Sequence, residues 1–188
     1  DSLALMEVIT FDDIPSGAGP GLHLDDVLPL KGARFGERFA GQRVTAAQTH
    51  DQIIGDAFDP LTMLAGAPGQ NLSVVRFYGN AVLNGYGHAG YPRRDAQGEG
   101  AIAVLFDRDQ SALSFDMRGG EAGTAQVTFL RRNGQLLTVV SVHPTGEFTL
   151  GFDRTGGIRD IAGFVVTNTD PQGLAIDTLR FGKPPDLS

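Results

Sequence analysis

Side chains suited to molecular recognition gather in one glycine-rich stretch near the middle of the chain, "GYGHAGYPRRDAQGEG" (Gly85–Gly100). Five of its sixteen residues are glycine, which disfavours a helix or strand and lets the backbone approach a ligand closely. Tyrosine rings can stack on the C–H faces of sugars, while arginine, carboxylate and histidine groups can hydrogen-bond to hydroxyls or to an acidic sugar. The stretch therefore predicts a binding loop, and these are its candidate ligand-binding residues: Tyr86, His88, Tyr91, Arg93, Arg94, Asp95 and Glu99.

Two other interpretations of this stretch stay open. In the first, the tyrosines cover an edge of the core, and the Arg–Asp pairs are solvated and contribute little to stability. In the second, Tyr86, His88 and Arg93 supply the tyrosine, histidine and arginine of a polysaccharide lyase.

Three carboxylates near the chain ends form a second candidate site. Side chains alternate along a strand, so Asp177 shares a face with Leu179 and Phe181, and Asp13, next to Asp12, extends the apolar face of the first strand. A buried carboxylate needs a hydrogen bond, an ion pair or a metal ion. If the first and last strands pair antiparallel, these carboxylates converge and suit a structural Ca²⁺ ion. Turn capping by the aspartates, or pairing with Arg180 or Arg159, are the alternatives.

The remaining titratable residues form no established catalytic pattern. The chain has no cysteine, and its four histidines lack the spacing of a zinc-binding motif. No nucleophile elbow, phosphate loop or dinucleotide fingerprint is present. The carboxylate pairs Asp107 with Asp109 and Asp116 with Glu121 could serve a glycosidase, but nothing distinguishes them from turn residues. We therefore expect a binding domain, with a polysaccharide lyase or glycosidase as the enzymatic alternative.

Strand-like segments that must position these residues dominate the chain. Leu113, Phe115 and Met117 alternate with polar residues, the pattern of a half-buried strand. Asn133-Gly134 predicts a hairpin with a type I′ turn. Residues 45–71 are the only stretch where a helical turn or two is plausible. Turn signals roughly every 8–12 residues predict an all-β protein, either a sandwich or a barrel.

The composition bounds the function further. The 188 residues suit one domain, which we place at residues 1–182, followed by a tail at 183–188. The net charge of −7, without a basic stripe, argues against nucleic acid and anionic lipid as partners. No segment approaches the ~18 apolar residues that span a bilayer. The start, "DSLALMEVITFDD", lacks an initiator methionine and is typical of a processed mature end, which hints at export.

Four segments resemble exported bacterial β-sandwich domains: jelly-roll carbohydrate-binding modules and related surface proteins with a sorting tail of the PEP-CTERM type. The segments are "VITFDDIPSG", "ALSFDMRGGEAGTAQVTFLRRNGQLL", "IRDIAGFVVTNTD" and "GLAIDTLRF". The resemblance implies a two-sheet antiparallel β-sandwich with jelly-roll topology. It also implies a secreted, periplasmic or cell-surface location and a structural calcium ion on Asp12 or Asp13 and Asp177. The chain departs from sugar-binding modules in having no tryptophan, and residues 22–84 match no part of the family.

These observations together predict a non-catalytic extracellular domain that binds a carbohydrate or another extracellular polymer and holds a structural calcium ion. A module for adhesion or matrix assembly, with a protein partner at the cell surface, is the alternative outside carbohydrate binding. An exposed apolar patch or an unprotected edge strand would favour that alternative.

Overall fold

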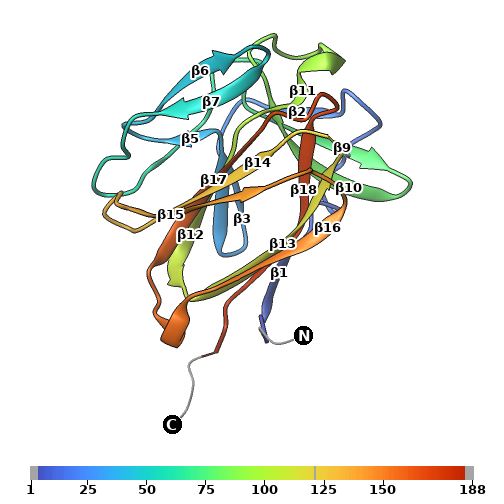
Figure 1. The fold of residues 1–188 in the computed structure, drawn as a ribbon. Helices are drawn as coiled ribbons and strands as arrows, with labels where there is room; N and C mark the ends of the chain where they lie inside the picture. The colour runs from blue at the N-terminus through green and yellow to red at the C-terminus, as the bar shows by residue number, and fades with distance from the viewer. Residues whose placement is uncertain (1–3, 121, 185–188) are drawn as a thin grey trace.

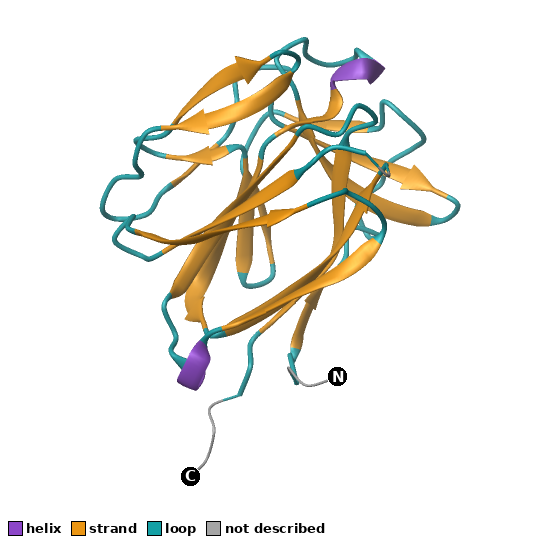
Figure 2. Cartoon of the chain, in the orientation of Figure 1, coloured by secondary structure: helices purple, strands orange, loops and turns teal. Residues whose placement is uncertain are grey.

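The computed structural model describes residues 4–120 and 122–184, and it folds them into two antiparallel β-sheets packed face to face (Figure 1). The only helices in these ranges are two short 3-10 turns, η1 (Arg94–Ala96) and η2 (Thr155–Gly157) (Figure 2). Neither turn is of a length or hydropathy that could cross a bilayer. The predicted all-β fold is confirmed, and the tail predicted at 183–188 lies outside the described residues from position 185 onward.

Sheet A is the larger of the two. Its strands follow the order β16-β13-β18-β10-β9-β2, with β1 paired to one half of β18 and β11 paired to the end of β10. The strands of sheet A are β1 (Glu7–Ile9), β2 (Leu22–Leu24), β9 (Leu72–Phe77), β10 (Asn80–Tyr86), β11 (Gln97–Gly100), β13 (Ala112–Gly119), β16 (Phe148–Asp153) and β18 (Leu174–Phe181).

Sheet B has the order β15-β14-β17-β12-β4-β3, and two small two-stranded sheets flank the sandwich. The strands of sheet B are β3 (Leu28–Leu30), β4 (Ala33–Gly36), β12 (Ile102–Gln110), β14 (Ala125–Leu130), β15 (Leu136–Val142) and β17 (Ile161–Asn168). The small sheets pair β5 (Arg38–Phe39) with β8 (Met63–Leu64) and β6 (Arg43–Ala47) with β7 (His50–Ile54).

The chain passes back and forth between the two large sheets. From β12 in sheet B it crosses to β13 in sheet A, returns for β14 and β15, and crosses again to β16. It then places β17 in sheet B and β18 in sheet A, and every pairing is antiparallel. This arrangement is the predicted two-sheet sandwich with jelly-roll topology.

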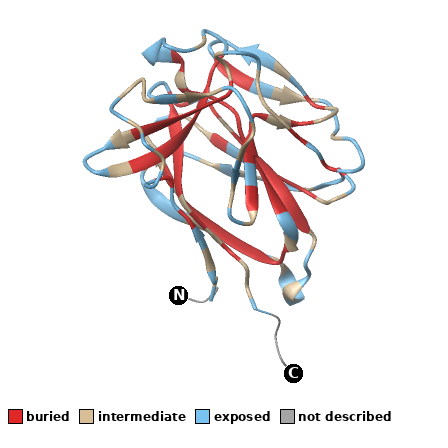
Figure 3. Cartoon of the chain, turned by 180° about the vertical axis from the view of Figure 1, so that it is seen from behind, coloured by how far each residue is buried: buried red, intermediate tan, exposed pale blue. Residues whose placement is uncertain are grey.

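The core lies between the sheets, where the buried segments of both run side by side (Figure 3). Phenylalanine rings from the two sheets meet there: Phe115 of β13 stacks on Phe164 of β17 with centroids 5.3 Å apart. Leu113, Phe115 and Met117 are fully buried, so the alternation predicted for this strand is confirmed. The alternate residues of β13, including Asp116 and Arg118, therefore face outward from sheet A.

The hairpin predicted at Asn133-Gly134 is present, but its turn type differs from the prediction. Strands β14 and β15 are joined by a longer loop in which Gly134 N–H donates to the Arg131 carbonyl, 2.9 Å away. Gly134 has a φ of 84°, whereas Asn133 is not among the residues with positive φ. The Asn133 carboxamide instead accepts a hydrogen bond from Gln135 N–H at 3.1 Å. Asparagine stabilises the turn through its side chain here, so its backbone does not need a left-handed conformation.

The prediction that residues 45–71 could form a helical turn is wrong. Strands β6 and β7 form a hairpin there, with Ala47 opposite His50, and β8 follows. Gln48 at the tip has a φ of 59°, a conformation found in tight turns and incompatible with a right-handed helix.

A candidate binding cleft on the outer face of sheet A

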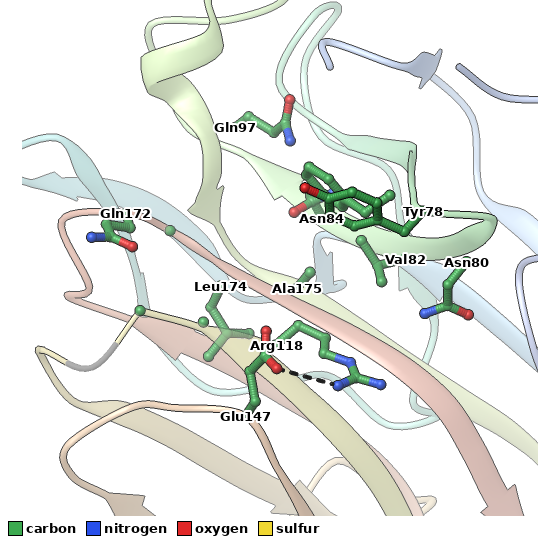
Figure 4. A pocket seen from close by; sticks show the side chains of 14 residues that line it. Tyr78, Asn80, Val82, Asn84, Gln97, Arg118, Glu147, Gln172, Leu174 and Ala175 are labelled. Atoms are coloured by element: carbon green, nitrogen blue, oxygen red, sulfur yellow. Dashed lines mark ion pairs between the residues drawn. The ribbon is translucent and has the colours of Figure 1, made fainter. Parts of the chain in front are cut away.

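A cleft of about 480 Å³ lies on the outer face of sheet A (Figure 4). Strands β10, β13 and β18 form its floor, the β9–β10 turn forms one side, and the loops before β16 and β18 form the other. The floor combines apolar and polar groups, because Val82 packs with Val75 and Ala175 while Asn84 and Arg118 lie alongside. We call this hollow the outer cleft.

The alternation of β10 determines which of its side chains reach the outer cleft. Ala81 and Leu83 belong to the core between the sheets, so Asn80, Val82 and Asn84 project to the opposite face. The burial of Asn84 is informative, since it is only 5% exposed and its Nδ2 donor has no hydrogen-bond partner among the described residues. An unpaired buried donor is costly to leave unsatisfied, which makes it a candidate contact for a ligand or a water molecule.

An exposed aromatic turn forms one side of the outer cleft. Phe77 and Asn80 pair across a two-residue hairpin, and the turn residues Tyr78 and Gly79 have φ of 48° and 83°. Positive φ at both central positions is the type I′ geometry that suits the twist of paired strands. The Tyr78 side chain is fully exposed at the cleft, and Phe77 is half-exposed beside it. An aromatic ring held in solvent by a rigid turn is available to a ligand with an apolar face.

Arg118 lies across the outer cleft from this turn and has few protein partners. Its guanidinium is 3.6 Å from a carboxylate oxygen of Glu147 (Figure 4). It is also 4.0 Å from a carboxylate oxygen of Asp177, and both distances are too long for hydrogen bonds. Its Nε donor is buried and has no partner among the described residues. The outer cleft therefore contains two unpaired buried donors, one on Asn84 and one on Arg118.

Asp170 holds the loops that form the far side of the outer cleft. Its buried carboxylate accepts hydrogen bonds from Gln172 N–H at 2.8 Å and from the hydroxyl of Thr145. Its backbone carbonyl accepts from Nε2 of His50 at 2.7 Å, so that ring nitrogen carries a proton. Through these bonds Asp170 positions Gln172 and the loop that carries Glu147.

Asp177, one of the predicted calcium ligands, lies buried beneath the outer cleft. One carboxylate oxygen accepts from the Asn80 side-chain amide at 2.8 Å, and the other accepts from Thr178 N–H at 2.7 Å. Thr178 has a φ of 44° and marks a bulge in β18 opposite β13. Because of this bulge Asp177 lies on the outer face of sheet A, so the prediction that it shares the core face with Leu179 and Phe181 is wrong. Arg180 pairs with Asp116, so the pairing of Asp177 with Arg180 considered from the sequence is absent.

The other two predicted metal ligands lie close in sequence but do not join Asp177 in a ligand set. Strands β1 and β18 pair antiparallel, as the calcium hypothesis required, and Ile9 lies opposite Leu179. Asp12 accepts a hydrogen bond from Ala81 N–H at 2.8 Å, and Asp13 is exposed. Within residues 4–120 and 122–184, no group of three or more acidic, histidine or cysteine side chains is placed to hold a metal ion. As placed, Asp12 and Asp177 accept hydrogen bonds from the start of β10, and calcium stays a prediction.

The glycine-rich stretch is less loop-like than the sequence predicts, because β10 extends to Tyr86 and β11 begins at Gln97. A Cβ on Gly85 would lie 2.3 Å from the Gly100 carbonyl oxygen, so glycine here allows two strands to approach closely. Tyr86 and Glu99 are consequently buried. The tyrosine of the lyase set considered with His88 and Arg93 therefore lies inside the fold.

The rest of the stretch forms a compact surface cap. Tyr91 stacks on His23, 4.7 Å between centroids, and both rings pack against Tyr86. Arg93 and Asp95 form an exposed ion pair at 2.6 Å, which lowers the pKa of Asp95. The interpretation in which tyrosines cover the core edge matches this arrangement, and none of the seven candidate residues lines the outer cleft: Tyr86, His88, Tyr91, Arg93, Arg94, Asp95 and Glu99.

The carboxylate pairs considered for a glycosidase are engaged elsewhere. Asp109 is bound by Arg132 at 2.7 Å, and Asp116 accepts from the Thr149 hydroxyl at 2.7 Å. Glu121 lies outside the described residues.

A second group of acidic residues, of which only Glu99 was a candidate from the sequence, is buried where β7 and β11 meet the sandwich. The pKa of Asp51 is raised to about 7, first by burial and then by the nearby charges of Glu37 and Glu99, against the opposing effect of a hydrogen bond from Ala101 N–H at 3.0 Å. Burial also raises the pKa of Glu37, against the attraction of Arg38. These groups lie outside the outer cleft and bear on stability.

Comparisons with known proteins give only distant structural neighbours. No protein-family model matches the sequence, and no curated protein matches it. Among solved structures, an arginine-to-alanine variant of a family 29 carbohydrate-binding module has a TM-score of 0.38 and 14% identity, covering 60% of this chain and 76% of that one. A lysine-to-alanine variant of the same module has a TM-score of 0.38 and 12% identity, covering 80% and 91%. A family 28 module specific for non-crystalline cellulose has a TM-score of 0.31 and 14% identity, covering 60% and 77%. Similarity at this level does not establish a shared family or a shared ligand.

Proposed function

We propose that this domain binds carbohydrate without catalysis, in the outer cleft. The observation that carries the proposal is the combination of an exposed aromatic turn, an apolar floor and two buried donors, on Asn84 and Arg118, that have no partner among the described residues. A sugar has apolar C–H faces and a ring of hydroxyl oxygens, so it can pack on Tyr78 while its oxygens accept from these donors. The proposal includes the extracellular setting predicted from the sequence, where polysaccharides are exposed.

Isothermal titration calorimetry with oligosaccharides tests this proposal, using Tyr78→Ala and Tyr91→Ala as a matched pair. Both substitutions remove an exposed tyrosine ring, but only Tyr78 lines the outer cleft. We expect Tyr78→Ala to weaken binding about tenfold, the loss of one aromatic contact, and Tyr91→Ala to leave affinity within about twofold. Loss of binding in Tyr91→Ala alone, with an unchanged melting temperature, would move the site to the loop predicted from the sequence.

A protein partner is the second candidate function, and the edge of sheet B favours it. Strand β15 ends that sheet and exposes Leu136 and Val139. An exposed apolar edge strand is a template for pairing with another chain. Sedimentation velocity from micromolar to millimolar concentration tests self-association, and a Val139→Lys substitution should abolish any dimer formed through this edge.

A further inference from the structure

We propose that the outer cleft selects neutral sugars over uronic acids, and that Arg118 and Glu147 together recognise their hydroxyl groups. This inference rests on the proposed carbohydrate-binding function and specifies its ligand class.

The spacing of Arg118 and Glu147 favours a hydroxyl group between them. The nearest Arg118 nitrogen and Glu147 oxygen are 3.6 Å apart, so the two groups face each other without a hydrogen bond (Figure 4). A hydroxyl both donates and accepts, so one hydroxyl, or two on adjacent carbons, can accept from the guanidinium and donate to the carboxylate. A uronate carboxylate only accepts, and it would meet the charge of Glu147 directly.

The unpaired donors of the outer cleft favour a ligand that is rich in neutral acceptor oxygens. Nε of Arg118 and Nδ2 of Asn84 are buried and lack partners among the described residues. Both require an acceptor, which the hydroxyl and ring oxygens of a neutral sugar supply in several directions. The Asn84 amide is neutral, so this part of the floor adds no attraction for an anion.

The net charge around Arg118 disfavours an acidic sugar. Among the described residues that line the outer cleft, Arg118 is the only cation. Its guanidinium already faces two carboxylates, Glu147 at 3.6 Å and the buried Asp177 at 4.0 Å. The three groups sum to a net charge of −1 when ionised, and the whole chain carries −7. An acidic sugar would therefore enter a region already negative overall, whereas a neutral sugar carries no charge to be repelled.

The test compares neutral and acidic probes of equal length by calorimetry at pH 7 and about 0.15 M salt. Cello-, manno- and xylohexaose are the neutral probes, and hexameric galacturonate and mannuronate are the acidic ones. The key variant is Glu147→Gln, which keeps the side-chain size and removes its charge. Asp95→Asn is the matched control, because it removes the same charge from an exposed ion pair outside the outer cleft.

The expected result is that a neutral probe binds the native protein and that Glu147→Gln weakens it about tenfold, while Asp95→Asn changes it less than about twofold. Glu147 is largely exposed, so the variant should fold normally, which its melting temperature verifies. Preferential binding of a uronate by the native protein, or an unchanged affinity of Glu147→Gln for the neutral probe, would overturn the inference while leaving carbohydrate binding in place. Absence of binding by every probe at millimolar concentration would overturn both the inference and the proposed function, if an extended panel of other glycans also fails.

Discussion

Replacing Asp51 by asparagine should make this protein more stable at pH 8 and leave it nearly unchanged at pH 4. The carboxyl of Asp51 is buried with Glu37 and Glu99 nearby, and burial raises its pKa from 3.8 to about 7. The asparagine side chain would keep an acceptor oxygen for the hydrogen bond from Ala101 N–H. Its new NH₂ group could donate toward the neighbouring carboxylates, and it carries no charge at any pH.

The magnitude follows from the difference between the folded and unfolded pKa values. Below about pH 4 both states hold the proton on Asp51, so its charge costs nothing. Between about pH 4 and pH 7 the unfolded chain releases the proton while the folded chain keeps it, and the free energy of unfolding falls by roughly 1.4 kcal/mol per pH unit. Above pH 7 the loss levels off at about 4 kcal/mol, and the asparagine variant avoids it.

Thermal and urea unfolding between pH 4 and pH 8 measures this effect. For a chain of this size, a difference of about 4 kcal/mol corresponds to roughly 10 °C in melting temperature at pH 8. Asp95→Asn is the control, because Asp95 is exposed and its pKa is lowered by Arg93 instead. If the native protein and Asp51→Asn show parallel stability curves over this pH range, Asp51 titrates normally and the account of its burial is wrong.

Three further predictions concern the elements around the outer cleft. Gly79→Ala should lower the free energy of unfolding by about 1 kcal/mol, because Gly79 has a φ of 83° that alanine disfavours even in open space. Gly17 also lies in open space but lacks a positive φ, so Gly17→Ala should leave the stability unchanged. Equal melting temperatures of the two variants would contradict this prediction. Asp177→Ala should lower the free energy of unfolding in urea by about 2 kcal/mol, because the Asn80 amide and Thr178 N–H lose their acceptor. A urea midpoint equal to that of the native protein would show that these hydrogen bonds do not contribute to stability. Excess EDTA should leave the melting temperature unchanged if Asp12 and Asp177 serve hydrogen bonding alone; a drop of several degrees that only Ca²⁺ reverses would support the calcium site.

The sequence was sufficient to predict the fold because the fold depends on local signals repeated along the chain. The alternation of Leu113, Phe115 and Met117 determines which face of β13 is buried, and period-2 patterning requires no knowledge of partners. The hairpin at Asn133-Gly134 was predicted from another local signal, an Asn-Gly pair between two strand-like segments. Its turn type was not, because loop length and the side-chain bond of Asn133 decide the geometry.

The candidate site could not be predicted in the same way, since its residues come from segments distant in sequence. Asn84, Arg118 and Glu147 become neighbours only when β10, β13 and the loop before β16 take their places around sheet A. One local signal was available: Tyr78-Gly79 between two apolar runs is consistent with a two-residue hairpin that leaves the tyrosine exposed. For the glycine-rich stretch, the composition suggested a loop from Gly85 onward. In the structure the alternation of Val82 and Asn84 continues to Tyr86, so strand β10 includes the first two residues of the stretch.

The most direct test of the account is a ¹H–¹⁵N NMR titration with a neutral hexasaccharide that binds by calorimetry. The account predicts that the side-chain signals of Asn84 Nδ2 and Arg118 Nε shift most, together with the backbone amides of Tyr78 and Asn80, because these residues line the outer cleft. Shifts confined to residues 87–96, with the Asn84 and Arg118 signals unmoved, would contradict it and place binding on the loop.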